Sequence, residues 1–183
     1  QETENHVSTR FLKRGQGLKS VTLNLKHPEG RDMFLKMAEQ SDVVVENIAP
    51  GAMGRLGLGY DEVSAVNPSI VYASISGYGQ TGPYASKRAH DPQIQGISGL
   101  MDINGAEDGP PTRVGFYIAD LVTPLFGCYS ILAALRERDR TGRGQYIDVS
   151  MIDTLTSLIF MDTLEEELEA GISLRQGNDV RGA

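Results

Sequence analysis

Short strands that alternate with helices along the chain predict an α/β fold, built on a parallel sheet that is flanked by helices. The first observation behind this prediction is the short apolar run within Asp42–Asn47, which is typical of a buried parallel strand. The second is the apolar spacing of Ala119–Arg140, which predicts a long helix before the next strand. Ligands bind beyond the carboxyl ends of the strands in such sheets, so strand ends that run into glycine and polar residues are candidate sites.

The first half of the chain supplies strands and helices in turn. Ser20–Leu25 alternates in polarity and is rich in β-forming residues, which predicts a strand. Pro28 stands at the start of a helix that carries Met33, Phe34 and Met37 at helical spacing. The next elements predicted are a strand at Asp42–Asn47, a short helix at Asp61–Val66 and a strand at Ser69–Gly79 that runs into glycines.

The second half is predicted to be rich in loops and then strongly helical. Residues Gly77–Gly115 form the loop-rich part, with one apolar segment near Ile94–Met101. In the helix Ala119–Arg140, the residues expected to line one face are Leu121, Leu125, Tyr129, Leu132 and Leu135. The pattern ends with a turn, a strand at Tyr146–Ser150 and a helix at Met151–Gly171.

Composition and charge exclude several classes of protein. The chain has 40% hydrophobic and 22% charged residues, as an ordinary globular protein does. Its net charge of −7 argues against general nucleic-acid binding, although local basic clusters leave room for a small anionic ligand. A single cysteine, Cys128, rules out an internal disulfide, and with three scattered histidines it argues against a Cys/His metal cluster.

The ends of the chain and its hydropathy bear on where the protein works. No apolar run approaches the roughly 18 to 20 residues that a membrane helix needs, and no signal peptide opens the chain. With the cysteine usage, this predicts a cytoplasmic protein that does not bind membranes. The chain lacks an initial methionine and ends in a polar tail, so we expect a piece of a longer protein.

Two candidate ligand contacts follow the strand at Asp42–Asn47. Asn47 stands at the strand's predicted exit, where it can contact a ligand or simply form a turn. Arg55 lies eight residues later in a glycine-rich loop, where it can bind a phosphate or remain solvated. The segment Arg14–Ser20 has the glycines of a phosphate loop but precedes a strand, so a turn is the preferred interpretation.

Two carboxylates and one histidine are the candidate chemical groups. His90 and Asp91 form either a catalytic pair or a loop histidine followed by a capping aspartate. Asp120 stands at the start of the long helix, where it can be the N-cap or a functional carboxylate held ionised by the helix dipole. In a pocket, such a carboxylate attacks an acyl carbon or accepts a proton.

Six segments together carry a resemblance to a known family. They are Lys19–Phe34, Asp42–Val63, Asn67–Tyr84, Gln95–Met101, Gly109–Asp120 and Ile131–Asp153, and the most specific stretches are Thr141–Asp153 and Ser74–Tyr84. In this order they resemble the family III CoA-transferases, which include formyl-CoA transferase, carnitine CoA-transferase and α-methylacyl-CoA racemase. The resemblance covers nearly the whole chain.

The resemblance implies a Rossmann-like large domain with a parallel sheet, in a homodimer whose two chains interlock like rings. Residues 1–183 would then be an internal part of the large domain, and the small domain would not be present in this chain. The implied substrates are an acyl-CoA thioester and a carboxylic acid, with no prosthetic group and no metal.

The family's catalytic aspartate matches Asp120. In the transferases this carboxylate attacks the acyl-CoA thioester to give a mixed anhydride, and CoA thiolate then converts the anhydride into an aspartyl-CoA thioester. Among the matching positions, Arg55 and Arg88 correspond to cations that contact the phosphates of CoA. The full set of implied CoA-binding positions is Leu23, Asn24, Leu25, Lys26, Asn47, Ile48, Ala49, Arg55, Arg88, Ala89, His90 and Asp91.

His90 leaves two activities open. The transferases usually have an aromatic residue at this position, whereas the racemases use a histidine together with the catalytic aspartate to move an α-proton. The segments Asp91–Met101 and Ala119–Pro124 resemble transferases more than racemases, so a transferase is the preferred interpretation. An acyl-CoA-binding protein without activity is a third hypothesis.

Overall fold

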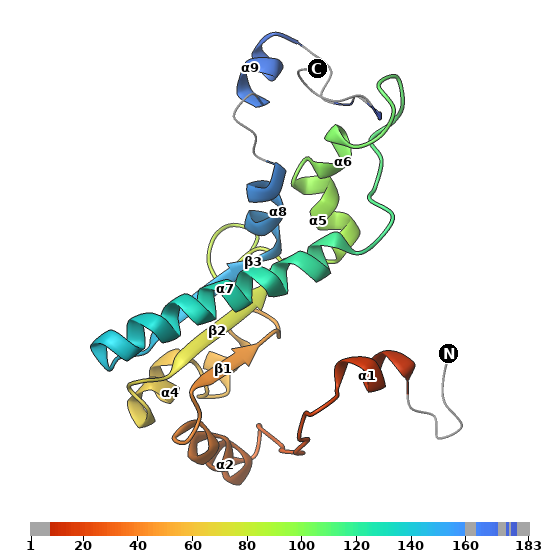
Figure 1. Ribbon diagram of the computed structural model, residues 1–183. Helices are drawn as coiled ribbons and strands as arrows, with labels where there is room; N and C mark the ends of the chain where they lie inside the picture. The colour runs from red at the N-terminus through yellow and green to blue at the C-terminus, as the bar shows by residue number, and fades with distance from the viewer. Residues whose placement is uncertain (1–7, 160–163, 172–174, 176, 179–183) are drawn as a thin grey trace.

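A computed structural model describes residues 8–159, 164–171, 175 and 177–178. Within these residues, three parallel strands form one sheet in the order β1-β2-β3, as Figure 1 shows. The strands are β1 (Val43–Glu46), β2 (Val71–Ser76) and β3 (Gln145–Ser150). The predicted α/β fold with a parallel sheet is therefore confirmed.

The described helices surround this sheet and extend beyond it. They are α1 (Thr9–Arg14), α2 (Pro28–Ala38), α3 (Ala52–Arg55), α4 (Tyr60–Val66), α5 (Asp91–Ile97), α6 (Leu100–Ile103), α7 (Ile118–Thr141), α8 (Met151–Ile159) and α9 (Leu164–Glu169). The helix predicted over Met151–Gly171 corresponds to α8 and α9, and residues 160–163 between them lie outside the described residues. Helices α3, α5 and α6 lie in segments for which the sequence predicted loops.

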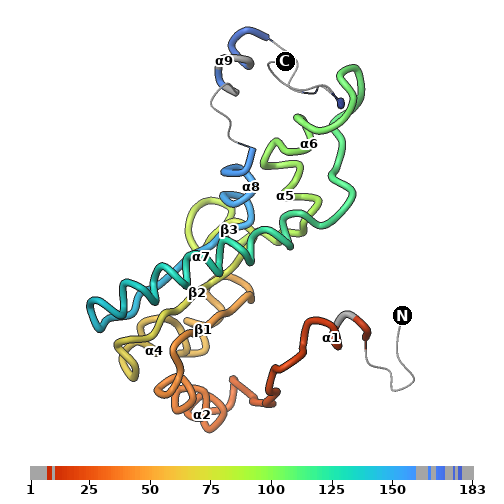
Figure 2. The backbone as a smooth tube through the Cα atoms, in the orientation of Figure 1, coloured from red at the N-terminus to blue at the C-terminus, as the bar shows by residue number. Residues whose placement is uncertain are grey.

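The strand predicted at Ser20–Leu25 is wrong. This segment has no regular structure, and Figure 2 shows it as part of the stretch between α1 and α2. Its alternating pattern is typical of a strand, but Val21 is 61% exposed and the segment pairs with none of the described strands. The segment ends in a turn instead, because the backbone N–H of His27 donates to the carbonyl of Asn24 (3.0 Å).

Helix α7 covers one face of the sheet through its small residues. Its buried positions are Ala119, Thr123, Gly127 and Ala134, and a Cβ on Gly127 would come within 3.2 Å of the Ile75 side chain. The large apolar residues that were expected to line one face do so, but four of them point away from the sheet. Leu121, Leu125, Tyr129 and Leu132 are 49–64% exposed.

By length and composition, α7 could also cross a membrane. This finding differs from the sequence expectation that no apolar run approaches the length of a membrane helix, because Thr123 and Ser130 divide the apolar stretches of this helix. In the structure, α7 lies along β2 and β3 as a helix that covers a sheet does (Figure 1).

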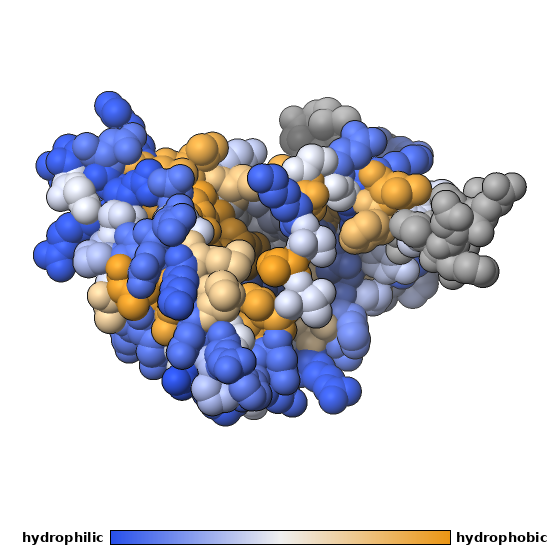
Figure 3. Space-filling model, turned by 90° about the horizontal axis from the view of Figure 1, so that it is seen from below, coloured by the Kyte–Doolittle hydropathy of each residue, from blue (hydrophilic) through white to orange (hydrophobic). Residues whose placement is uncertain are grey.

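Two apolar clusters fix the other elements. On the face opposite α7, Ala38 of α2 and Val63 of α4 pack with Ile70 and Tyr72 of the β2 region. Beyond the carboxyl ends of the strands, Ile94 of α5, Ala119 of α7 and Leu155 of α8 form a second cluster. Figure 3 shows apolar residues gathered around a hollow at the centre of the face seen from below, with hydrophilic residues around it.

The segment after β2 folds back onto the end of that strand. A Cβ added to Gly77, the first residue after β2, would collide with the Cβ of Ala89. The φ angle of Gly77 is not in the left-handed region, so its glycine is required by this close approach and not by backbone conformation. The contact places Arg88, Ala89 and His90 over the carboxyl end of β2.

We predict that Gly77→Ala lowers the free energy of unfolding by about 1–3 kcal/mol, because the added methyl overpacks this contact. Replacing Ala89 by glycine in the Gly77→Ala variant removes the colliding methyl and should recover most of the loss. Gly54→Ala is the matched control, since an added Cβ there has no neighbour within 4 Å. Urea unfolding of the full double-mutant cycle measures the coupling, and additive effects of the two changes would contradict the contact.

Candidate active site

A pocket of about 340 Å³ opens at the carboxyl ends of β1 and β2, beside the start of α7. Asp120 contributes a carboxylate from α7, and Arg88 and His90 come from the segment after β2. The residues that line the pocket are Asn47, Ile48, Ala49, Pro50, Ser76, Gly77, Ser86, Lys87, Arg88, Ala89, His90, Asp120 and Met151. The structure therefore brings together seven of the sequence-predicted site residues: Asn47, Ile48, Ala49, Arg88, Ala89, His90 and Asp120.

The loop after β1 is held against β2 on one side of the pocket. The side-chain amide of Asn47 donates to the carbonyl of Ile75 (2.6 Å), and the N–H of Ile48 donates to the carboxylate of Glu46 (2.8 Å). Asn47 thus serves the backbone, as a turn asparagine does, and also lines the pocket. The turn interpretation of Asn47 is therefore supported, and its place in the pocket wall is compatible with the predicted ligand contact.

Lys87 and Arg88 both line the pocket, but they differ in whether their charge already has a partner. The ammonium of Lys87 lies 3.8 Å from the centre of the Tyr84 ring, a cation–π contact that uses its charge. The guanidinium of Arg88 makes no ion pair with any residue that the structure describes. Arg88 is therefore the cation of this segment that is available to an anionic ligand.

Asp120 is not the N-cap of α7. The helix begins at Ile118, its N-cap is Tyr117, and Asp120 lies in the first turn. Asp91 takes the capping role from another helix: one carboxylate oxygen accepts the N–H groups of Ala119 (2.7 Å) and Asp120 (3.2 Å). The capping interpretation of Asp120 is wrong, and its side chain is free to face the pocket.

Asp91 is buried beneath the pocket and does not line it. It is 2% exposed, and its second oxygen accepts the side-chain amide of Gln95 (2.5 Å). The same Gln95 side chain accepts the backbone N–H of Val114 (2.9 Å), so the chain before α7 is also held. This placement makes Asp91 a positioning residue for Asp120, whereas the resemblance implied contact with CoA.

The pKa of the Asp120 carboxyl is raised above its usual value. Burial is the largest cause, and the negative charge of Asp91 is the second. His90 and Arg14 act in the opposite direction, because positive charge favours the carboxylate. Arg14 of α1 lines a second hollow of about 390 Å³ on the other side of Asp120, with Phe116, Tyr117 and Leu121.

A separate basic hollow of about 240 Å³ lies at the start of α2. Its charged residues are Lys26, Arg31 and Arg55, with His27 beside them. Arg55 also donates to the carbonyl of Pro50 (3.4 Å), and Pro50 lines the Asp120 pocket. Arg55 therefore stands between the two hollows rather than in the same pocket as Arg88.

The remaining predicted positions near this hollow differ from one another. Leu25 and Lys26 line it, whereas Leu23 and Asn24 line neither it nor the Asp120 pocket. The side chain of Asn24 accepts the N–H of Lys26 (3.2 Å), and its carbonyl lies so close to Gly30 that a Cβ there would collide with it. Asn24 shapes the turn that presents Lys26. Sequence reasoning did not select Arg31, whose position in the first turns of a predicted helix was the available signal.

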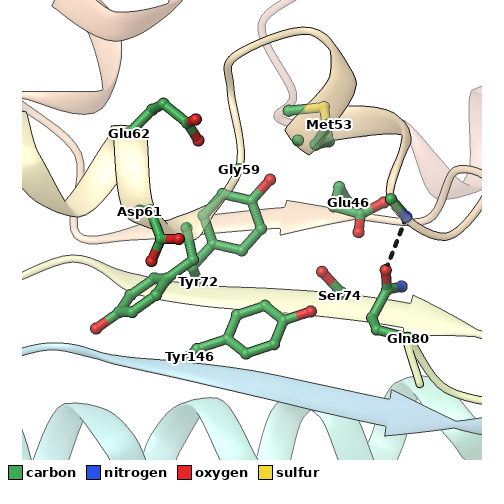
Figure 4. A pocket seen from close by; sticks show the side chains of 12 residues that line it. Glu46, Met53, Gly59, Asp61, Glu62, Tyr72, Ser74, Gln80 and Tyr146 are labelled. Carbon is green, nitrogen blue, oxygen red and sulfur yellow. Dashed lines mark hydrogen bonds between the residues drawn. The ribbon is translucent and has the colours of Figure 1, made fainter. Parts of the chain in front are cut away.

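A fourth hollow, of about 400 Å³, is shown in Figure 4 and has the opposite charge. Glu46, Asp61 and Glu62 line it together with three tyrosines, and the hydroxyl of Tyr72 donates to the carbonyl of Leu58 (3.0 Å). Burial, followed by the charge of Glu46, raises the pKa of Tyr72, so this hydroxyl stays protonated. Three carboxylates make this hollow unsuitable for phosphates.

No group of three metal-ligating side chains comes together among the described residues. The Asp120 pocket itself holds the carboxylate of Asp120, the imidazole of His90 and the guanidinium of Arg88. A carboxylate with a raised pKa, in one pocket with an arginine that makes no ion pair to a described residue, suits nucleophilic or proton-transfer chemistry on an anionic substrate.

We predict that two substitutions move the pKa of Asp120 in opposite directions. Asp91→Asn should lower it, because a negative charge beside Asp120 is removed while the side-chain shape is kept. His90→Phe should raise it, because a group that favours the carboxylate is lost. Carboxyl carbon NMR of the two variants and the wild type measures the shifts, and shifts of the same sign would contradict the electrostatics described here.

Comparisons with known proteins identify relatives of this chain. The model of CoA-transferase family III matches residues 1–183. Over 144 residues the chain is 48% identical to an acetyl-CoA:oxalate CoA-transferase from Acetobacter aceti, covering 78% of this chain and 36% of that protein. It is 42% identical over 150 residues to a succinyl-CoA:glutarate CoA-transferase from Mus musculus, covering 82% of this chain and 34% of that one.

A solved structure agrees with the fold as well. A crystal structure of a CaiB/BaiF family protein from Brucella suis superposes with a TM-score of 0.79 at 36% identity, over 87% of this chain and 42% of that chain. The chain thus spans about a third of the length of the two curated relatives named above. The match over the whole chain, together with these relatives, shows that the protein belongs to CoA-transferase family III.

Proposed function

We propose that this chain carries the reaction centre of an enzyme that moves CoA from an acyl-CoA thioester to a free carboxylic acid. The observation that carries the proposal is Asp120, whose carboxylate faces a pocket while Asp91 holds the backbone on which it stands. The guanidinium of Arg88, which makes no ion pair within the described part of the chain, lies in the same pocket and supports an anionic substrate.

The proposed chemistry begins with attack of an Asp120 oxygen on the thioester carbonyl. The carbon–sulfur bond breaks, CoA leaves as a thiolate, and a mixed anhydride of Asp120 remains. The thiolate then attacks the carbonyl of the Asp120 side chain, which releases the acyl group as a carboxylate and leaves an aspartyl-CoA thioester. An acceptor carboxylate attacks that thioester, and the same two steps in reverse deliver CoA to it.

The raised pKa of Asp120 suits this role. A carboxylate that is partly desolvated is less stabilised by water and is therefore a stronger nucleophile once ionised. The protonated acid cannot attack, so the rate should fall as the pH decreases through the raised pKa. Asp91 raises the pKa of Asp120 through its negative charge, and it also holds the first turn of α7 in place through two hydrogen bonds.

The Asp120 pocket and the basic hollow together support one orientation for bound CoA. The thioester end belongs in the Asp120 pocket, and the phosphates of the nucleotide belong near Arg88, which lines that same pocket, and near Lys26, Arg31 and Arg55 in the basic hollow. The contact of Arg55 with Pro50 joins these two places. No prosthetic group is required by this chemistry, and CoA is a substrate.

The acceptor is proposed to be a small dicarboxylic acid. The relatives act, by name, on oxalate and glutarate, and a further relative from Haloarcula marismortui, 38% identical over 172 residues, acts on mesaconate. These acids share a second carboxylate beside the one that receives CoA.

A second candidate function rests on His90. This imidazole lines the same pocket as Asp120, so the pair could move the α-proton of a 2-methylacyl-CoA as a racemase does. An acyl-CoA-binding protein without turnover is the third hypothesis. The kinetic experiment below separates all three.

The wider architecture belongs to the same proposal. Residues 1–183 would form an internal part of the large domain of an interlocked homodimer that works in the cytoplasm. The exposed apolar residues Leu121, Leu125, Tyr129 and Leu132 on α7 support a surface that is covered in the assembled protein.

We predict that His90→Phe in the full-length protein retains most of the exchange of CoA between succinyl-CoA or acetyl-CoA and oxalate, glutarate or mesaconate. A transferase needs only a shaping side chain at this position. A racemase should lose about 100-fold or more in α-proton exchange, since a general acid–base is removed. Mass spectrometry follows the CoA exchange, and proton NMR in deuterated water follows the α-proton.

Asp120→Ala should abolish exchange, and wild-type enzyme with acyl-CoA should be inactivated by hydroxylamine through a hydroxamate at Asp120. If the wild type washes out the α-proton without an acceptor acid and forms no hydroxamate, the racemase function replaces the transferase. CoA binding with neither reaction, across the whole panel, would leave only the binding protein.

We predict that Arg88→Ala raises the KM for acyl-CoA by roughly 10- to 150-fold, because a charged phosphate contact contributes about 1.5–3 kcal/mol. Lys87→Ala is the matched control. Its neighbouring ammonium is held over Tyr84, and its loss should change KM by less than about 5-fold, the effect of a partly exposed cation–π contact. Equal effects of the two substitutions would show that Arg88 has no special contact.

A further inference from the structure

One buried hydroxyl in the Asp120 pocket has no partner in the described part of the chain. Ser76 is the last residue of β2, it is 5% exposed, and its Oγ makes no hydrogen bond to any described residue. A buried hydroxyl without a partner costs free energy, so such a group in a pocket wall points to a ligand atom that completes it.

The neighbours of Ser76 explain why it remains unpaired. Its partner across the sheet is Ser150 of β3, whose Oγ already donates to Asp153. Two residues after Ser150, the backbone N–H of Ile152 donates to the carbonyl of Gly77 (3.1 Å), so this donor is not available to Ser76 either. On the β1 side, the amide of Asn47 is committed to the carbonyl of Ile75. Ser76 also lines the pocket that contains Asp120 and His90, so a ligand bound there is the remaining candidate partner for its buried hydroxyl.

Resting on the proposed transfer of CoA, we propose that the Ser76 hydroxyl donates a hydrogen bond to the carbonyl oxygen of the acyl-CoA thioester and stabilises the oxyanion that forms there. When an Asp120 oxygen bonds to the carbonyl carbon, the π electrons of the C=O bond move onto this oxygen. When the oxyanion collapses, they re-form the C=O bond and the electrons of the C–S bond leave with the thiolate. Ser76 keeps its proton throughout.

The site suits this task because the donor is buried and held on a strand. A donor fixed by the fold needs no reorganisation when charge develops, and its bond strengthens as the carbonyl oxygen becomes an anion. Arg88 in the same pocket adds positive charge, whereas the position of Ser76 at the end of β2 gives direction. An oxygen that accepts from Ser76 is also the partner that the buried hydroxyl lacks.

Ser76→Ala in the full-length protein tests the proposal, with Ser74→Ala as the matched control. Ser74 lies on the same strand and the same face with 2% exposure, but it lines the acidic hollow and shares a hydrogen bond with Tyr146. We expect Ser76→Ala to lower kcat for CoA exchange by about 100- to 1000-fold with little change in KM, as loss of an oxyanion donor does. Ser74→Ala should retain a kcat close to that of the wild type. A rise in KM with kcat unchanged, or no effect, would overturn the proposal.

A binding measurement separates this proposal from the transferase chemistry itself. The probes are a ketone analogue of acetyl-CoA, in which a methylene replaces the sulfur, and S-ethyl-CoA, which has no carbonyl. Ser76→Ala should weaken binding of the ketone by about 2- to 12-fold and leave S-ethyl-CoA unchanged. This selective loss would assign Ser76 to the carbonyl even if Asp120→Ala left CoA exchange intact, which is the result that rejects the transferase mechanism. Equal loss for both probes, or no loss for either, would overturn the role of Ser76.

Discussion

The carboxylate of Asp91 is the interaction on which the candidate site depends. It joins the start of α5 to the first turn of α7, where it accepts the backbone N–H groups of Asp120 and of Ala119, which is 28 residues from Asp91 in the chain. The first N–H groups of a helix have no partner within the helix, and a negative charge there is also favoured by the helix dipole. Without Asp91, each of these two donors would be left unpaired at a cost of about 1–3 kcal/mol. Because Asp120 is one of the two residues held, its backbone position follows from that of Asp91.

Charge is distributed unevenly around this anchor. Asp91 lies below Asp120 and raises its pKa, while His90 and Arg14 lie near enough to lower it. The basic hollow of Lys26, Arg31 and Arg55 is separate from the acidic hollow of Glu46, Asp61 and Glu62. Although its net charge is −7, the protein has a local concentration of positive charge at the basic hollow, where an anionic substrate would be attracted. Net charge alone could not locate these local sites, because it sums the charges of the whole chain.

The regular elements were predictable because their signals are local. The apolar run at β1, the strand that ends in glycine at β2 and the spacing of α7 each reflect burial that the sequence pattern records. The strand prediction for Ser20–Leu25 was wrong because an alternating polarity pattern does not show whether a neighbouring strand is available for pairing. The large apolar residues of α7 show the helical spacing but do not mark the face that packs on the sheet. That face is made of small residues such as Thr123 and Gly127.

Strand ends and helix starts selected Asn47, Arg55, His90, Asp91 and Asp120 as candidates, but only the resemblance assigned them roles, and the roles of some residues were not predictable at all. Asp120 and His90 are brought together by a close contact between Gly77 and Ala89 that leaves no pattern in the sequence. Asp91 looked equivalent to its neighbour His90, but burial makes it an anchor. Ser76 gave no signal because an unpaired hydroxyl is defined by what surrounds it in space, and strand positions in the sequence do not show that.

The most direct test of this account is chemical identification of the residue that becomes covalently linked to CoA. The full-length protein would be mixed with acyl-CoA, treated with borohydride and digested, and the peptides would be sequenced by mass spectrometry. Borohydride reduces a thioester to an alcohol, so the account predicts that the Asp120 side chain is reduced, in an acyl-CoA-dependent manner. Reduction of a different carboxylate, or exchange of CoA with no reduced residue anywhere, would contradict the role of Asp120 as nucleophile.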